Sequence, residues 1–409
     1  MINWTNRELD SRFVQFFYYV YTVMVTRTAE SRLLKLSKSF RSVAVVGPRQ
    51  SGKTTLCRLV FPAKPYVSLE NPDVWEFSRT DPRGFLAQYP TGAILDEVQK
   101  APHLFSYLQQ VLDETTKKGL FILTGSSNFI MQEGISQTLA GRVGYLELLP
   151  LSIEEIAGNQ RLPAHFASLA FKGGYPELYR GAMRPIDWYP NYISTYIERD
   201  VRQLKNIGSL GAYLRFLKLC AGRNGQILNL ASLANDCGID SKTAGSWLSV
   251  LQTSFIVYLL RPYHVNFNKR VVKSPKLYFY DTGLACHLLG VEKYQQVNTH
   301  AAKGALFENL VIMEVLKSRL NKGMPDNLYY WRDKTGHEID LVLEAGGKMT
   351  AVEVKAGETI AGDYFRHMDY FDSITDGPLK KLLIYNGTES QQRSGNLRIM
   401  NWKGISEYI

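Results

Sequence analysis

The stretch VAVVGPRQSGKTTLCRLV, residues 43–60, decides the fold of the first part of the chain. Its first four residues are apolar and mostly β-branched, which predicts a buried strand of a parallel sheet. The pattern G-x-x-x-x-G-K-[ST] follows, in which backbone N–H groups surround phosphate oxygens at a helix N-terminus. Its lysine reaches the β and γ phosphates, and its hydroxyl ligates magnesium. The stretch therefore predicts an α/β P-loop domain that binds ATP and Mg²⁺. The expected nucleotide contacts are Gly47, Pro48, Arg49, Gln50, Ser51, Gly52, Lys53, Thr54 and Thr55.

An acidic pair follows the next apolar strand, in GAILDEVQ (residues 92–99). Such a strand delivers Asp96 at its carboxyl end, where parallel sheets bind ligands. We expect Asp96 to join Thr54 around the magnesium, Glu97 to activate the attacking water and Lys53 to act on the phosphates. The alternative is that the acidic pair only begins the next helix.

Two later stretches also offer nucleotide-site candidates. In LFILTGSSN (120–128) the strand ends in small polar residues, and we expect Ser126, or its neighbours Ser127 and Asn128, to contact the γ-phosphate. In LAGRVG (139–144), Arg142 is predicted to stabilise transition-state charge, within the chain or across to a neighbouring subunit of a homo-oligomer. A surface arginine is the alternative.

Length and composition bound the rest of the chain. Its 409 residues predict two or three domains, and a net charge of +10 favours nucleic acid as a partner, although an anionic membrane or plain solubility would also fit. Four scattered cysteines predict a reducing, cytoplasmic location. The apolar stretch 13–25 is too short to span a bilayer. It is interpreted as a buried helix, or as residues preceding a true start at Met24, and no membrane partner is expected.

The middle of the chain is predicted to be helical. Residues 151–208 are interpreted as a lid, with a turn at KGGYPE (172–177). Three helical stretches and two alternating strands in residues 209–282 have the spacing of a winged helix. Six basic residues and no acidic one lie between Ser241 and Tyr280, which predicts contact with DNA phosphates. The alternative is a winged helix that only packs between domains. The candidate DNA contacts are Lys242, Lys269, Arg270 and Lys273.

Residues 338–355, EIDLVLEAGGKMTAVEVK, predict a β-hairpin that turns at two glycines. That turn places Asp340 opposite Glu353 and Glu338 opposite Lys355, with all four side chains on one face. Glu338 and Lys355 are expected to form a cross-strand ion pair. Like charges at Asp340 and Glu353 destabilise a hairpin, and a Mg²⁺ ion between them would remove the conflict. Lys355 would then position the attacking water or stabilise the developing charge.

Taken together, these motifs resemble a family of prokaryotic AAA-type ATPases with a C-terminal nuclease-like domain. The resemblance runs from about residue 30 to about residue 360. It rests on GPRQSGKTTL, LDEVQ, LTGSSN, LAGR, LPLSIEE, GGYPE, YIERDVRQL, YFYDTGLACHLLG, GALFENLVIMEVL and EVKAG. It implies a five-stranded parallel core, ATP binding and hydrolysis. The hairpin resembles the PD-(D/E)xK nuclease fold, in which Glu308 would supply a third metal-binding carboxylate.

The expected architecture has five parts. These are an N-terminal extension (1–30), an AAA-type core (31–150), a helical lid (151–208), a winged helix (209–282) and an α/β nuclease-like domain (283–409). The expected function is ATP-dependent binding of DNA, with metal-dependent cleavage. The alternatives are a nucleotide-switched regulator that binds nucleic acid without cutting it, and a protein-interaction ATPase in which the basic segment only packs.

Overall fold

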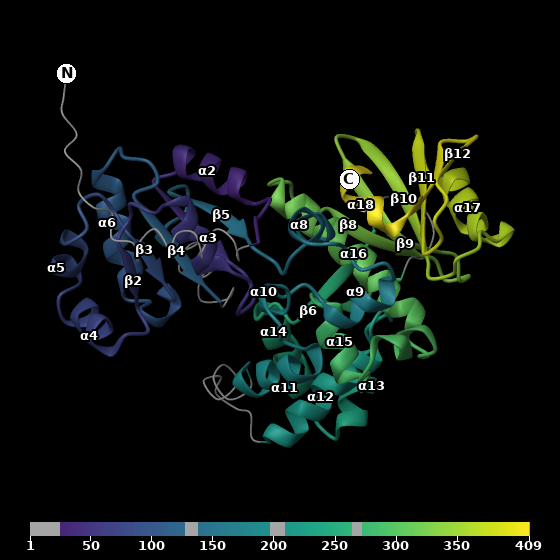
Figure 1. Cartoon of the computed structure of the whole chain (residues 1–409), viewed down its shortest axis with the longest axis horizontal. Coiled ribbons are helices and arrows are strands. Elements are labelled where there is room, and N and C mark those ends of the chain that lie inside the picture. The colour runs from purple at the N-terminus through teal and green to yellow at the C-terminus, as the bar shows by residue number, and fades with distance from the viewer. Residues whose placement is uncertain (1–24, 127–137, 197–208, 264–271, 409) are drawn as a thin grey trace.

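The computed structural model describes residues 25–126, 138–196, 209–263 and 272–408 (Figure 1). Most of the apolar N-terminal stretch and the candidates Ser127, Asn128, Lys269 and Arg270 lie outside the described residues. None of the described helices is both long enough and apolar enough to cross a membrane.

The first part of the chain is a five-stranded parallel sheet in the order β2-β3-β4-β1-β5, which confirms the predicted α/β core. The central strand β1 alternates between two apolar layers, with Val43 and Val45 on one face and Ala44 and Val46 on the other. Helices α2 and α3 cover the first face, and α5 and α6 cover the second. The elements are α2 (Glu30–Ser39), β1 (Ser42–Val46), α3 (Lys53–Val60), β2 (Tyr66–Ser68), α4 (Pro72–Thr80), α5 (Pro82–Ala87), β3 (Ile94–Asp96), η1 (Val98–Lys100), α6 (Leu104–Glu114), β4 (Phe121–Gly125) and β5 (Val143–Glu147).

Helices follow, as the sequence predicts. A capping box formed by Ser152 and Glu155 begins α8, and the side chain of Asp240 caps α14. Gly238 has φ 72° and ends α13, in agreement with the predicted helix end. The helices are α8 (Ile153–Asn159), α9 (Phe166–Lys172), α10 (Glu177–Arg180), α11 (Pro185–Tyr196), α12 (Leu210–Gly222), α13 (Leu230–Cys237) and α14 (Ser241–Thr253).

The second sheet is mixed and has the order β12-β13-β11-β10-β9-β8-β6-β7. Strands β6 and β7 form an antiparallel pair, and β6 continues the sheet by pairing in parallel with β8 through Arg261 and Pro262. The two strands assigned from sequence to a separate winged helix therefore extend the C-terminal sheet, with no break at residue 282. The strands are β6 (Val257–Pro262), β7 (Lys276–Phe279), β8 (Leu328–Arg332), β9 (Glu338–Ala345), β10 (Lys348–Lys355), β11 (Leu379–Tyr385), β12 (Gln391–Arg393) and β13 (Leu397–Asn401).

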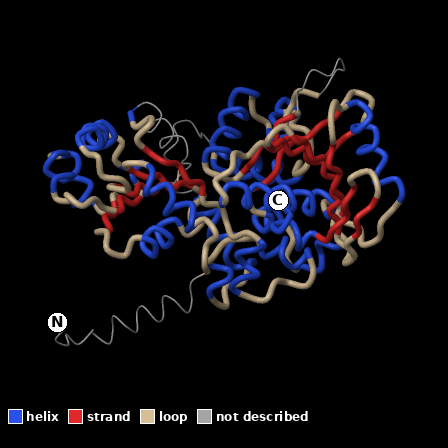
Figure 2. Tube along the Cα trace, turned by 90° about the horizontal axis from the view of Figure 1, so that it is seen from above, coloured by secondary structure: helices blue, strands red, loops and turns tan. Residues whose placement is uncertain are grey.

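Helix α16 (Lys303–Asn321) lies against one face of the second sheet, and α17 (Arg366–Ile374) lies against the other. The largest apolar cluster joins side chains of both sheets, the middle helices and α16, so the parts share one core. Figure 2 shows the two groups of strands on either side of this helical region. The remaining elements are α15 (Thr282–Leu288), η3 (Tyr294–Asn298), η4 (Gly362–Phe365), η5 (Trp402–Gly404) and α18 (Ile405–Tyr408).

Candidate functional site

The loop between β1 and α3 has the backbone of a phosphate-binding loop. Gly47, Gln50 and Gly52 have φ of 152°, 60° and 92°. A Cβ atom at Gly47 would lie 2.1 Å from the carbonyl oxygen of Leu148, so only glycine fits at that position. Lys53 begins α3, which places the helix N-terminus directly after the loop.

Lys53 is a buried cation, and among the described residues its side chain donates hydrogen bonds to backbone carbonyls of the loop itself. Its Nζ donates to the carbonyl oxygens of Gly47 (3.0 Å) and Pro48 (2.7 Å). Burial lowers the pKa of Lys53 to about 8. The Oγ of Ser51 is also buried and has no hydrogen-bond partner among the described residues. A lysine without a directly bonded anion and an unpaired hydroxyl in one loop fit a triphosphate.

Thr54 and Asp96 lie side by side, as the predicted magnesium site requires. The hydroxyl of Thr54 donates to Oδ1 of Asp96 over 3.0 Å, and Thr124 also donates to Oδ1. The hydroxyl of Tyr66 donates to Oδ2 over 2.6 Å, and burial together with this bond raises the pKa of Tyr66 to about 12. The sequence analysis missed Tyr66 because nothing in a short strand indicates which carboxylate its side chain will reach.

Glu97 sits at the carboxyl end of β3 with a left-handed backbone, φ 55° and ψ 44°. This conformation is costly for a non-glycine residue and recurs at functional sites. The Glu97 carboxylate accepts hydrogen bonds from Gln99 Nε2 and from Ser126 Oγ, the latter over 3.2 Å. Ser126, predicted to contact phosphate, thus touches Glu97 in this structure.

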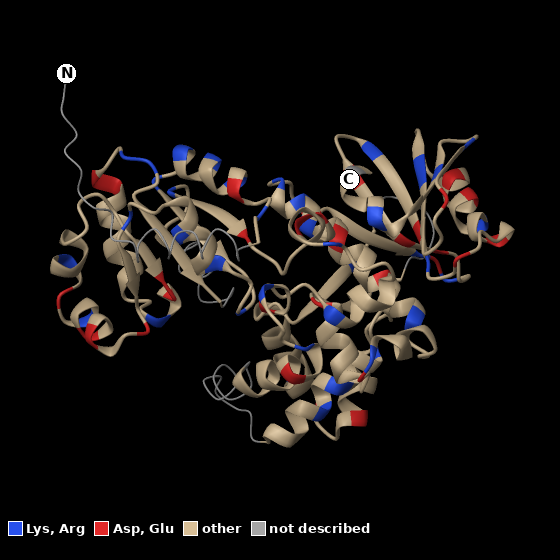
Figure 3. Cartoon of the chain, in the orientation of Figure 1, with Lys and Arg blue, Asp and Glu red and all other residues tan. Residues whose placement is uncertain are grey.

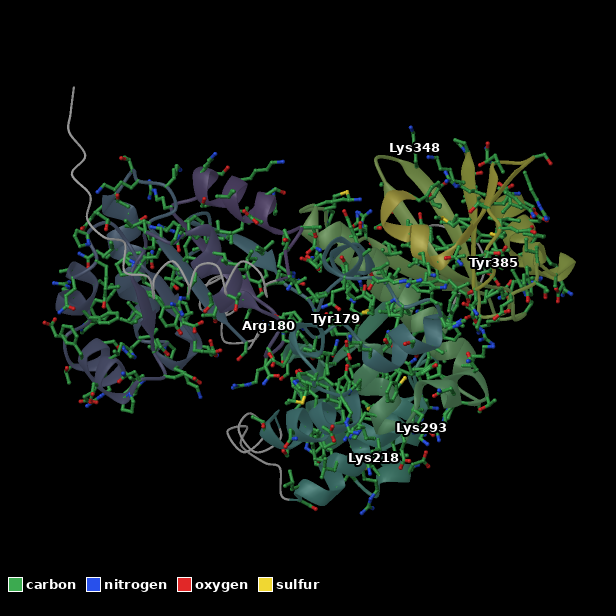
Figure 4. The ribbon with its side chains drawn as sticks, viewed as in Figure 1. Tyr179, Arg180, Lys218, Lys293, Lys348 and Tyr385 are labelled. Carbon is green, nitrogen blue, oxygen red and sulfur yellow. The ribbon has the colours of Figure 1, made fainter. Side chains whose placement is uncertain are left out.

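A cavity of about 910 Å³ opens over the loop, lined by Lys53, Thr54 and Glu97. Two other segments complete it: residues 25–27 together with Glu30 at the start of α2, and the α10–α11 region. Arg27 and Arg180 come from these segments, and the sequence analysis missed both. Figure 4 shows Arg180 on α10 at the junction of the two halves of the molecule. The KGGYPE turn marked the start of this region in the sequence, but not that it faces the loop.

Arg142 lies elsewhere, which corrects one of the two predicted placements. It precedes β5, whereas the phosphate-binding loop follows β1, and the two strands are parallel neighbours. Arg142 therefore lies at the amino ends of the parallel strands, whereas the phosphate-binding loop lies at their carboxyl ends. Its guanidinium donates to both oxygens of Asp113, over 2.5 and 2.9 Å. Arg142 does not reach the loop of its own chain, and its role across a subunit boundary stays a prediction.

The C-terminal hairpin has the predicted register. Five pairs from Lys348–Ala345 to Val352–Leu341 follow it, and Gly346 and Gly347 have φ of 58° and 73°. At the far end, Lys355 Nζ contacts Glu353 Oε1 at 2.5 Å and Asp340 Oδ2 at 3.9 Å. Burial and the charge of Asp340 raise the pKa of Glu353 to about 8. Lys355 is therefore a cationic neighbour of both carboxylates, although its single charge offsets only one of them.

The predicted ion pair between Glu338 and Lys355 is wrong. Glu338 pairs with Lys276 of β7 and with Arg332, the latter over 2.7 Å. Lys276 Nζ also donates to Glu308 Oε1 over 2.9 Å. A lysine from outside the predicted nuclease-like domain thus contacts two of its carboxylates, which no pattern within residues 283–409 could reveal.

The carboxylates Glu308, Asp340 and Glu353 do not fit the predicted magnesium site in this arrangement. Among the described residues, no group of three or more His, Cys, Asp or Glu side chains is placed to hold a metal ion. In this arrangement Lys276 contacts Glu308, and Lys355 contacts Asp340 and Glu353.

Two candidate DNA contacts fall within the described residues. Lys242 is exposed in the first turn of α14, and Lys273 is exposed before β7. Figure 3 shows basic and acidic residues intermixed over the described elements. The DNA role of these lysines stays a prediction.

Comparison with known proteins shows three family matches along the chain. Residues 39–157 match an AAA domain, residues 163–295 match a Domain of unknown function (DUF8612), and residues 303–405 match a Domain of unknown function (DUF4143). The first match and the parallel sheet identify the N-terminal part as a P-loop AAA-type domain.

Whole-chain relatives and solved structures add the following. Uncharacterized proteins of Mycobacterium tuberculosis and Mycobacterium bovis are each 31% identical over 336 residues, which cover 81% of this chain and 74% of theirs. A Walker-type ATPase of Pyrococcus abyssi has a TM-score of 0.44 at 14% identity, covering 65% of this chain and 96% of that one. A RuvB protein of Thermotoga maritima has a TM-score of 0.33 at 16% identity, covering 58% and 90%. With TM-scores below 0.5, neither structure bears on function here.

Proposed function

Because the chain belongs to the family of these uncharacterized mycobacterial proteins and carries an AAA domain, we propose that it is an ATPase that binds and hydrolyses ATP at the loop between β1 and α3. The observation that carries the proposal is Lys53, buried at the floor of a cavity of about 910 Å³ and hydrogen-bonded to its own loop carbonyls. A buried lysine without a directly bonded anion is costly, and phosphate oxygens would relieve that cost.

The residues around the loop divide the work of hydrolysis. Backbone N–H groups of the loop and Lys53 bind and orient the phosphates. Thr54 and Asp96 would hold Mg²⁺, which supplies positive charge to the phosphate oxygens when bound. Glu97 accepts the proton of the attacking water, and its release from Gln99 and Ser126 would free the carboxylate for that role.

Two variants test this proposal. Lys53→Ala is expected to abolish ATP binding because it removes the fixed positive charge of the loop. Glu97→Gln is expected to keep ATP binding and to lose turnover by a factor of about 100 or more, because an amide cannot take the proton. Binding by calorimetry and phosphate release should be measured on the same preparations. Wild-type turnover in Glu97→Gln would contradict the assignment.

A second candidate function is control of DNA binding by the nucleotide state. It is supported by the exposed Lys242 at the start of α14 and the exposed Lys273 before β7. Two other basic residues of the same stretch, Arg261 and Lys276, are paired with carboxylates. Replacing both Lys242 and Lys273 with Glu is expected to weaken duplex DNA binding. It should also make the plot of log affinity against log salt concentration less steep, by an amount that corresponds to about two lost phosphate contacts. If affinity and slope are both unchanged, these lysines do not contact DNA, and the region only packs between other parts of the molecule. No cleavage step is proposed, because the C-terminal carboxylates do not fit a metal ion.

A further inference from the structure

Arg27 is a buried arginine in the segment before α2, which the sequence analysis treated as an extension outside the ATPase. Its guanidinium donates three hydrogen bonds to residues that the structure describes. Nη1 donates to the carbonyl oxygen of Ser51 over 2.7 Å, Nη2 donates to that of Leu149 over 2.6 Å, and Nε donates to Glu155 Oε1 over 2.9 Å. One side chain therefore connects the phosphate-binding loop, the end of the parallel sheet and helix α8.

Glu155 is a fixed partner for Arg27. Its Oε2 accepts the N–H of Ser152, and its Oε1 also accepts the N–H of Thr28, each over 2.9 Å. Burial alone would raise the pKa of Glu155, but Arg27 and these N–H groups hold it below its usual value. The pair is therefore ionised at neutral pH, and both charges are satisfied.

The segment that receives Arg27 is itself anchored to helix α16. Lys317 Nζ donates to the carbonyl oxygen of Leu151 over 3.0 Å. Glu314 Oε2 accepts the N–H of Ile153 over 2.6 Å. These bonds are buried, so residues 149–155, which we call the support segment, are held in place by α16 and in turn bind the Arg27 side chain.

The phosphate-binding loop needs such a support. Ser51 lies between Gln50 and Gly52, both of which have positive φ, so its peptide groups are held in a conformation that extended chain does not favour. Among the described residues, its N–H donates one long hydrogen bond, to the Pro48 carbonyl over 3.3 Å. The carbonyl oxygen of Ser51 accepts a short, charge-assisted hydrogen bond from Arg27, and this bond holds the loop backbone in place.

We infer that Arg27 is a positioning residue of the nucleotide site. It holds the backbone at Ser51 in the phosphate-binding conformation by bracing it against the support segment. Arg27 lines the same cavity, and its Nη1 lies 3.7 Å from the Cβ position of Gly52. Only a planar, three-pointed donor can make these contacts together, so lysine is not an equivalent residue here. The inference rests on the proposed ATPase function.

The test uses the full chain and two variants. In Arg27→Gln/Glu155→Gln both buried charges are removed together, so neither is left unpaired. In Arg27→Lys the charge remains and the fork is lost. Because both variants lose the charge-assisted hydrogen bond to the Ser51 carbonyl in its present geometry, we expect KM for ATP to rise about tenfold or more in both. We expect kcat to change less than about threefold, since Glu97, Thr54 and Asp96 are untouched.

The matched control is Lys381→Gln, which removes a buried lysine that bonds Asp369 and Asp372, each over 3.0 Å, in the C-terminal sheet. It should lower the melting temperature and leave KM unchanged. If Arg27→Gln/Glu155→Gln melts earlier but keeps the wild-type KM, Arg27 is only structural and the inference fails. If wild type itself neither binds nor hydrolyses ATP in the same assay, the proposed function fails instead.

Discussion

The phosphate-binding loop and the C-terminal hairpin both place a lysine beside two carboxylates, but they use the charges differently. In the loop, Lys53 bonds carbonyl oxygens, while hydroxyl and amide groups bond Asp96 and Glu97. In the hairpin, Lys355 bonds Glu353 directly. Among the described residues, Lys53 thus has no direct ion pair with Asp96 or Glu97, whereas Lys355 is directly paired with Glu353.

The pKa directions of the two lysines follow from this difference. Burial dominates at Lys53 and lowers its pKa to about 8. Burial also acts on Lys355, but Asp340 and Glu353 overcome it and raise the pKa of Lys355. An added anion would stabilise the charged form of Lys53, whereas Lys355 already has carboxylate partners. A lysine close to carboxylates in sequence therefore indicates a ligand site only where the folded chain does not pair the lysine with those carboxylates.

The largest effect on this comparison is expected at Lys276. Lys276→Met would leave Glu308 and Glu338 buried or half-buried without their shared cation, and breaking such a pair costs about 3–5 kcal/mol. ATP binding should be unchanged in the fraction that folds. Chemical denaturation with and without ATP measures both. A loss below about 1 kcal/mol would show that these carboxylates do not depend on the lysine.

A smaller, pH-dependent effect is expected at Glu147, the last residue of β5. Burial and the charge of Asp326 raise its pKa from 4.5 to about 7. The folded state therefore holds the proton more tightly, and this contribution to stability is lost as pH rises from about 4.5 to 7. The free energy of unfolding of Glu147→Gln should match that of wild type near pH 4.5 and exceed it above pH 7, by at most about 3.5 kcal/mol since one pKa unit corresponds to about 1.4 kcal/mol.

Denaturation of both proteins between pH 4.5 and 8 would measure this difference. A constant difference across that range would remove Glu147 as its source.

The smallest effect is expected at Asp340. Asp340→Asn removes one charge from a group in which Lys355 already balances Glu353, and the amide oxygen can still accept the N–H of Val354, a 2.8 Å bond in the wild type. Stability should stay within about 1 kcal/mol of wild type, as expected for a partly exposed charge contact. Thermal melts in chelator give the number. A loss above about 2 kcal/mol would mean that Asp340 carries more of the hairpin than its contacts indicate.

Local patterns predicted much of this molecule correctly. The apolar strand and glycine loop at residues 43–54 predicted a parallel-sheet domain. The apolar strand before Asp96 predicted that Asp96 would lie near Thr54, because such strands deliver ligand-binding residues at their carboxyl ends. The two glycines at 346–347 likewise predicted the register of the hairpin.

Contacts between distant segments could not be predicted in the same way. Lys276 reaches Glu338 because β6 extends the C-terminal sheet, and no local pattern indicates that pairing. Arg27 reaches Ser51 because the segment before α2 folds back over the loop. Arg142 was misplaced within the chain because its motif does not indicate the edge of the sheet at which it lies.

We propose a nucleotide site at Lys53 and, among the described residues, no metal site at the hairpin. Titration calorimetry tests it most directly, with Mg²⁺–ATP and with Mn²⁺ alone added to the same full-length protein. We predict one ATP site that Lys53→Ala removes, and no heat of Mn²⁺ binding that differs between wild type and Asp340→Asn. A Mn²⁺ site present without ATP and lost in Asp340→Asn would contradict the account.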